Sequence, residues 1–128
     1  MNISASLDGT GKEKDINDVL DDEMILDIGS KTILTIEKII NKSKTVLWNG
    51  PAGYFENPNF ANGCFEIAKK IIEKNKDNRI YSVAGGGDTI AALNEMKVIN
   101  NFNFVSTAGG AFLEYLEGKE LPGIKALN

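Results

Sequence analysis

Apolar residues recur along this chain with two different spacings. In two segments they are three or four positions apart, which predicts amphipathic helices at 33–42 and 60–74. We expect the charged residues between those apolar positions, Lys74 among them, to face solvent. Elsewhere, short runs rich in β-branched and aromatic residues are typical of buried strands. These runs lie at 24–29, 45–48, 79–84 and 102–107.

Two of the predicted strands lead directly into glycines and then into a helical pattern. The strand at 79–84 is followed by Gly85-Gly86-Gly87 and by a helix that opens at Asp88. The strand at 102–107 is followed by Gly109-Gly110 and by a helix at 111–117. Gly118 is a typical helix stop, so we expect residues 119–123 to form a loop.

Strands that alternate with helices of about 10–15 residues predict parallel pairing. The fold class is therefore α/β, with an open parallel sheet and helices on both of its faces, as in Rossmann-like folds. Ligands of such sheets bind beyond the carboxyl ends of the strands. The turn Asn49-Gly50-Pro51 and the two glycine turns all follow a predicted strand, so we expect the three to converge on one crevice.

Composition limits the chain to one globular unit and excludes several classes of partner. It has 128 residues, 42% of them hydrophobic, and a net charge of −4 with Arg79 as the one arginine. We therefore expect no nucleic-acid partner. Residues 1–29 carry eight Asp and Glu and only two lysines. This uneven charge indicates that the first fifth of the chain is an acidic lead-in and not part of the packed structure.

Other absences narrow the chemistry. No segment approaches the ~20 apolar residues of a membrane span, so we expect no membrane partner. Cys64 is the only cysteine, and nothing in the sequence favours an oxidising compartment, which predicts a cytoplasmic protein. The chain contains no histidine, which excludes His-ligated metals and Ser-His or Cys-His nucleophile pairs.

The glycine turns are suited to binding an anion. Bare backbone amides at the positive end of a helix dipole attract phosphate, and glycine permits close approach. Asp88 would repel a bare phosphate but would hold Mg²⁺ that two phosphates chelate. The sequence therefore favours a Mg-nucleotide. A tight turn in which Asp88 merely caps the helix is an equally open interpretation.

Three further positions have a functional and a plainer interpretation. Thr89 could donate its hydroxyl to a phosphate or be an ordinary residue of the first helical turn. Glu56 could contact a ribose hydroxyl or be a solvated acid. The amides of Gly109 and Gly110 could face a phosphoryl group during transfer, or simply form a turn.

Four ordered segments of the chain closely resemble the phosphoglycerate kinase family. The resemblance covers residues 24–127 well and the acidic lead-in loosely, which divides the chain into a lead-in at 1–23 and a domain at 24–128. It implies a two-lobed enzyme that transfers a phosphoryl group between ATP and 3-phosphoglycerate. This chain resembles only the last part of the C-terminal, nucleotide-binding lobe. The four segments are 45–56, 83–89, 105–111 and 116–123, and the third has Ala108 where the family commonly has glycine.

The resemblance also implies roles for single residues. Asn49 and Pro51 would line the nucleotide pocket, and Glu56 would hold the ribose. Asp88 would hold Mg²⁺, and Thr89 would touch a phosphate. The glycines implied to face the phosphates of ATP or ADP are Gly85, Gly86 and Gly87, and those implied to act on the transferring group are Gly109 and Gly110.

The family's phosphate-binding lysines and its basic substrate cluster have no counterpart in this chain. Three hypotheses remain open at this point. The chain could be part of a kinase that is active, and binds 3-phosphoglycerate, only when the missing lobe is supplied. It could instead be a non-catalytic nucleotide-binding module or an inactive remnant of a split gene. We expect either self-association or a complementing chain, because half of a doubly wound sheet leaves apolar surface exposed.

Overall fold

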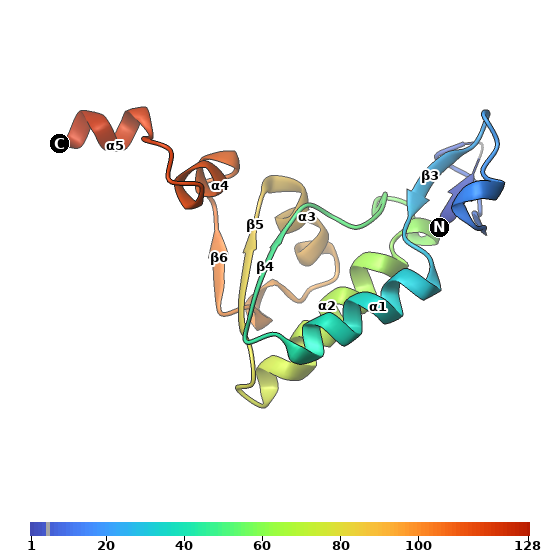
Figure 1. Cartoon of the computed structure of the whole chain (residues 1–128), viewed down its shortest axis with the longest axis horizontal. Helices are drawn as coiled ribbons and strands as arrows, with labels where there is room; N and C mark the ends of the chain where they lie inside the picture. The colour runs from blue at the N-terminus through green and yellow to red at the C-terminus, as the bar shows by residue number, and fades with distance from the viewer. Residues whose placement is uncertain (5) are drawn as a thin grey trace.

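The computed structural model describes residues 1–4 and 6–128. Its helices and strands follow one another from a small N-terminal sheet to two C-terminal helices (Figure 1). The strands are β1 (Asn2–Ser4), β2 (Lys12–Glu13), β3 (Met24–Asp27), β4 (Thr45–Asn49), β5 (Tyr81–Gly85) and β6 (Phe104–Ser106). The α-helices are α1 (Ser30–Lys42), α2 (Asn62–Lys76), α3 (Gly87–Glu95), α4 (Gly110–Leu116) and α5 (Pro122–Leu127).

The central sheet is parallel and has the strand order β4-β5-β6. Asn49 is paired with Gly85, and Gly85 with Ser106, so the three strands end level with one another. The predicted parallel α/β sheet is therefore confirmed. The predicted strand at 24–29 also exists as β3, but it pairs antiparallel with β1 in a separate sheet of order β2-β1-β3.

Helices α2 and α3 pack on the same face of the parallel sheet, whereas we expected helices on both faces, while Phe112 of α4 contacts the other face, at Gly85. The buried cluster joins Trp48 of β4 and Ala84 of β5 to Ile71 of α2 and Leu93 of α3. The connections β4-α2-β5 and β5-α3-β6 both add the next strand on the same side of the previous one. Because such connections are right-handed, they place α2 and α3 on the same face of the sheet. Helices on the second face would need strands added in the opposite direction, beyond β4.

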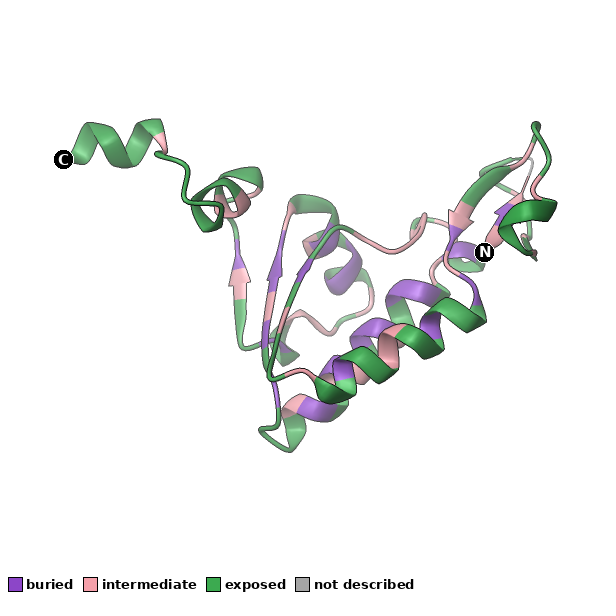
Figure 2. Cartoon of the chain, viewed as in Figure 1, coloured by how far each residue is buried: buried purple, intermediate pink, exposed green. Residues whose placement is uncertain are grey.

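The other face, which we call the bare face, carries Leu47, Tyr81 and Phe104. These side chains are 42%, 51% and 50% exposed. Figure 2 shows exposed and intermediate segments along these strands between the buried ones. In Figure 1 the helices α1, α2 and α3 lie to one side of the strands, while α4 and α5 extend away from the carboxyl end of β6.

Both ends of the chain contain regular secondary structure. In the acidic segment Ile3 is buried, and Lys14 forms an ion pair with Glu23 at 2.7 Å. At the other end, residues 119–121 form a loop as expected, but Pro122 and Gly123, which we also expected in the loop, begin α5. Pro122 explains this correction, because a proline in the first turn of a helix loses no hydrogen bond there. None of the described helices is long and apolar enough to cross a bilayer.

Lys74 is buried rather than solvated, which corrects the sequence-based expectation. Its ammonium group donates to the carbonyls of Ile40, Asn41 and Ser43 at 2.9, 2.7 and 3.1 Å. These carbonyls belong to the end of α1, where the helix dipole is negative. Lys74 of α2 therefore caps α1 across the interface between the two helices.

Replacing Lys74 by methionine should remove this cap. We expect Lys74→Met to lower the free energy of unfolding by ~2 kcal/mol, because carbonyls that had bonded a charged donor lose their partner. Lys69→Met, at an exposed position of the same helix, should change it by less than ~0.5 kcal/mol. Urea denaturation followed by circular dichroism measures both. Equal midpoints for the two variants would contradict the capping role.

Candidate functional site

The three turns singled out by the sequence lie side by side at one edge of the parallel sheet. They follow the paired residues Asn49, Gly85 and Ser106, each at the carboxyl end of its strand. Two of them lead directly into the N-termini of α3 and α4. The predicted convergence of these turns at one edge is thus present, and we call this edge of the sheet the glycine edge.

The first two turns touch each other. The Gly50 N–H donates to Thr89 Oγ1 at 2.6 Å. Gly86 has a φ of +88°, and a Cβ there would lie 2.9 Å from Asn49 Oδ1. Gly86 is therefore required both for its backbone conformation and for the close approach of the Asn49 side chain.

The third turn lies next to the second. Phe112 of α4 packs over Gly85, where a Cβ would come within 3.2 Å of its ring. Gly109 has a φ of +57°. A Cβ at Gly87, Gly109 or Gly110 would meet no atom within 4 Å, so the surface in front of both helix N-termini is open.

The first turn of α3 has free amides and one acid. Gly86 is the N-cap, and no side chain caps this helix, which is contrary to the interpretation of Asp88 as a cap. Asp88 is exposed in the first turn. Among the described residues no three His, Cys, Asp or Glu side chains group as metal ligands. A cation at Asp88 would therefore take its remaining ligands from a bound molecule or from water.

Thr89 has a structural role that the sequence did not indicate. It is fully buried, and its hydroxyl oxygen accepts the Gly50 N–H. Thr89 therefore links the first turn of α3 to the loop after β4. Its side chain points into the protein and not toward solvent.

Thr89→Val should break this link without changing the side chain's volume. We expect the free energy of unfolding to fall by ~1 kcal/mol, because the Gly50 N–H loses its acceptor. Thr89→Ser keeps the hydroxyl oxygen and should retain most of the stability. Urea denaturation compares the two variants. If valine were tolerated as well as serine, the hydrogen bond would not stabilise this edge.

The loop 50–57 begins at the glycine edge with Gly50 and runs from there toward β3 and α2 (Figure 1). Pro51 is half-buried and Glu56 is exposed. The Ala52 N–H donates to Cys64 Sγ at 3.2 Å, and the Tyr54 N–H donates to the Leu26 carbonyl at 2.7 Å. The loop is thus attached to both α2 and β3.

Asp27, the last residue of β3, is a buried acid that the sequence pattern did not mark as functional. It is 3% exposed, and its carboxylate accepts the backbone N–H groups of Gly63 and Ile28 at 2.9 and 2.8 Å. Burial raises the pKa of Asp27, while these backbone hydrogen bonds oppose the shift. Burial likewise raises the pKa of the neighbouring Cys64 thiol. The only signal in the sequence was an aspartate at the end of an apolar run.

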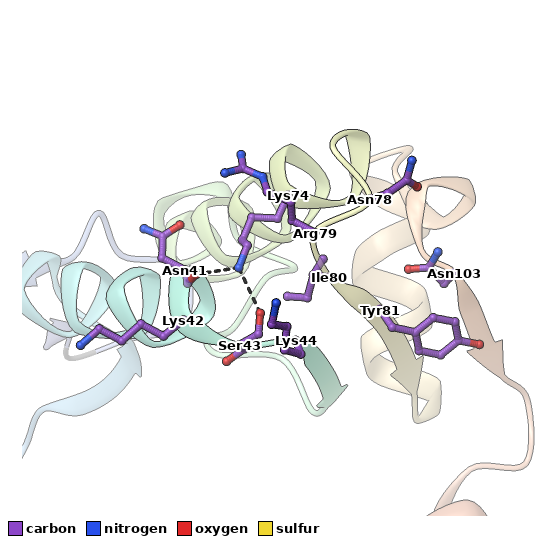
Figure 3. A pocket seen from close by; sticks show the side chains of 10 residues that line it. All are labelled: Asn41, Lys42, Ser43, Lys44, Lys74, Asn78, Arg79, Ile80, Tyr81 and Asn103. Carbon is purple, nitrogen blue, oxygen red and sulfur yellow. Dashed lines mark hydrogen bonds between the residues drawn. The ribbon is translucent and has the colours of Figure 1, made fainter.

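A cavity of about 670 Å³ opens at the opposite end of the sheet, beside Tyr81 at the start of β5 (Figure 3). Its lining includes the cationic residues Lys42, Lys44, Lys74 and Arg79. The helices α1 and α2 both end here, and Figure 3 shows Lys74 directed at the end of α1. Two of these cations already have partners, because Lys74 donates to the carbonyls at the end of α1 and Arg79 forms an ion pair with Asp77.

Comparison with known proteins decides the family. The family model described as phosphoglycerate kinase matches residues 2–119. The chain belongs to the phosphoglycerate kinase family. The match begins at residue 2, so it includes the acidic lead-in, which resembles the family only loosely by its motifs.

Individual phosphoglycerate kinases support this membership. The chain is 51% identical over 113 residues to the enzyme of Bartonella tribocorum and 53% identical over 112 residues to that of Zymomonas mobilis. Each alignment covers 88% of this chain but 28% of the relative. The chain thus spans well under half the length of the curated phosphoglycerate kinases it matches.

Solved structures agree with the sequences. The phosphoglycerate kinase of Coxiella burnetii superposes with a TM-score of 0.87 and 40% identity, over 99% of this chain and 32% of that one. The phosphoglycerate kinase of Pyrococcus horikoshii OT3 superposes with a TM-score of 0.69 and 37% identity, over 82% of this chain and 25% of that one. The small N-terminal sheet therefore lies within a region that the Coxiella burnetii structure shares.

Proposed function

We propose that this chain is the nucleotide-binding part of a phosphoglycerate kinase and that its glycine edge binds Mg-ADP or Mg-ATP. The observation that carries the proposal is the adjacency of three glycine-containing turns in front of two open helix N-termini. Six or more oxygens of a polyphosphate require several donors, and backbone amides on neighbouring turns can supply them together.

The roles follow from position. The amides of the turn 85–87 would hold the nucleotide phosphates, and those of Gly109 and Gly110 would face the transferring phosphoryl group. Asn49 and Pro51 would line the nucleotide pocket, and Glu56 would bind the ribose. Thr89 would act on this site through Gly50. Its hydroxyl hydrogen is free to donate to a phosphate, but because Thr89 is fully buried, that contact would require the residues that cover it to move.

The residues present fit a magnesium ion that arrives with its nucleotide. Mg²⁺ is commonly held by one or two carboxylates together with substrate phosphates and water. Asp88 offers one exposed carboxylate at the glycine edge. Bound Mg²⁺ would neutralise part of the phosphate charge. Asp88 would determine which phosphates the ion contacts.

Turnover requires cationic residues that the three turns of this chain do not contain. In the reaction we propose, ATP and 3-phosphoglycerate give ADP and 1,3-bisphosphoglycerate, and negative charge is held on the phosphoryl group in flight. The segments 49–57, 85–89 and 106–112 contain no lysine or arginine. A single positioned arginine is worth ~10³–10⁵ in rate in other phosphoryl-transfer enzymes. We therefore assign kinase activity and 3-phosphoglycerate binding to an assembly that includes the remaining part of the enzyme.

Calorimetric titration of the chain with Mg-ADP tests the binding function, and a coupled kinase assay on the same sample tests turnover. We expect saturable heat of binding and no turnover. Absence of heat at millimolar Mg-ADP would reject the nucleotide site. Turnover by the pure chain would reject the need for the missing part.

We also propose that the rest of a phosphoglycerate kinase covers the bare face. Leu47, Tyr81 and Phe104 are apolar and exposed there, and the relatives contain more than twice this chain's length beyond the matched region. The occupant would be a complementing chain if the remaining part is a separate polypeptide.

Without that occupant, we expect the chain to self-associate through the bare face. Light scattering should show a mass that rises with protein concentration. The combined variant Leu47→Thr, Tyr81→Thr and Phe104→Thr should remain monomeric, since threonine keeps the strand propensity and removes apolar area. A monomeric unchanged chain at all concentrations would contradict this prediction.

A further inference from the structure

Asp27 lies at the end of β3, outside the glycine edge, and no step described so far uses it. We propose that Asp27 is a positioning residue for the loop 50–57, which carries Pro51 and Glu56. The inference rests on the proposed function, because those two residues are the nucleoside contacts assigned above.

The carboxylate of Asp27 caps α2 from a distant strand. Its Oδ2 accepts the N–H of Gly63 in the first turn of α2, and its Oδ1 accepts the N–H of Ile28. The N-cap residue of α2 is Ala61, which supplies no side-chain hydrogen bond. A negative charge at the positive end of the helix dipole then fixes β3 against α2.

The backbone of the loop rests directly on this carboxylate. A Cβ at Gly53 would clash with Asp27 Oδ1 and with the Phe60 carbonyl, and a Cβ at Gly63 would clash with the same Oδ1. Neither glycine has a positive φ. Space alone, therefore, requires glycine at both positions, one in the loop and one in α2.

The neighbours of Gly53 are held by the neighbours of Asp27 and Gly63. The Ala52 N–H donates to Cys64 Sγ, and Cys64 follows Gly63. The Tyr54 N–H donates to the carbonyl of Leu26, which precedes Asp27. Three consecutive loop residues thus lie against β3 and the start of α2, which the Asp27 carboxylate joins. Weakening that link would loosen the surface on which the loop rests.

Trp48 provides a built-in reporter of the loop. It is the only tryptophan, and its indole N–H donates to the Gly50 carbonyl at 2.7 Å at the start of the loop. A loop that is no longer held should expose the indole more often. Acrylamide quenching of its fluorescence measures that exposure independently of any ligand.

The test compares Asp27→Asn with Asp8→Asn, which removes a charge at an exposed position. The variants are titrated with Mg-ADP, which needs the nucleoside contacts, and with Mg-pyrophosphate, which needs only the glycine edge. For Asp27→Asn we expect an Mg-ADP affinity about tenfold weaker, an unchanged Mg-pyrophosphate affinity and stronger quenching of Trp48. Asp8→Asn should match the unchanged chain in all three.

A purely structural role would not separate the two ligands. Equal losses for Mg-ADP and Mg-pyrophosphate, or unchanged quenching and affinity, would overturn the positioning role. If Asp27→Asn does not fold, the variant Gly53→Ala replaces it, because its methyl group would clash with the Asp27 carboxylate from the loop side. Its control is Gly123→Ala, whose methyl group meets open space. For Gly53→Ala we again expect weaker Mg-ADP binding, unchanged Mg-pyrophosphate binding and stronger quenching of Trp48. If the unchanged chain binds neither ligand, the proposed function fails, while Trp48 quenching still decides whether Asp27 holds the loop.

Discussion

The variant Asp88→Asn is expected to bind Mg-ADP about tenfold more weakly than the unchanged chain, and to bind metal-free ADP at least as tightly. The carboxylate at position 88 stands among amides that attract phosphate. With Mg²⁺ present it is a ligand, so removing its charge weakens the complex. Without Mg²⁺ it repels the phosphates, so removing its charge helps.

Titration calorimetry with ADP, in excess Mg²⁺ and in a chelator, measures both affinities. Glu95→Gln is the matched control, because Glu95 is an exposed acid at the other end of the same helix. That variant should leave both affinities unchanged. If Asp88→Asn shifts the two affinities in the same direction, Asp88 does not hold the metal.

The variant Gly86→Ala should have the largest effect on the glycine edge. A methyl group there faces two costs: a φ of +88° and a distance of 2.9 Å to Asn49 Oδ1. Strain of this kind is worth ~1–3 kcal/mol per residue. The displaced Asn49 also disturbs the turn after β4, so we expect Mg-ADP affinity to fall by about a hundredfold or more.

Substitutions at two other glycines distinguish the backbone strain from the clash with Asn49. Gly118→Ala places a side chain at a φ of +80° with nothing within 4 Å, so it carries the backbone strain without the clash. Gly87→Ala meets open space at the same turn. Urea denaturation and Mg-ADP titration of all three variants give the comparison. If Gly86→Ala behaves as Gly118→Ala does, the contact with Asn49 does not shape this edge.

Local patterns predicted the parts of this fold that depend on nearby residues. The spacing of apolar positions located α1 and α2, because that period is a property of the helix itself. The glycine edge was also accessible, because parallel strands end at the same side of a sheet wherever the chain carries them. Asn49, Gly86 and Gly109 lie at or just after the carboxyl ends of three parallel strands, and this alone predicts that they are close together.

Features that depend on distant partners were not accessible. Lys74 lies on the polar side of its helix by period, yet it caps a helix that ends more than thirty residues earlier in the chain. Asp27 accepts from Gly63, and Thr89 accepts from Gly50, across similar separations. The bare face exists because successive strands are added in one direction across the sheet. The spacing of apolar residues in helices and strands does not specify that direction.

The most direct test of one shared nucleotide site is the response of backbone amides to Mg-ADP in ¹H–¹⁵N NMR spectra of the unchanged chain. We predict that the amides of Gly50, Gly86, Gly87, Gly109 and Gly110 shift together, with one common affinity, while Lys74 and Arg79 at the opposite end do not respond. Shifts confined to a single turn, or found around Lys74 and Arg79 instead, would contradict the account.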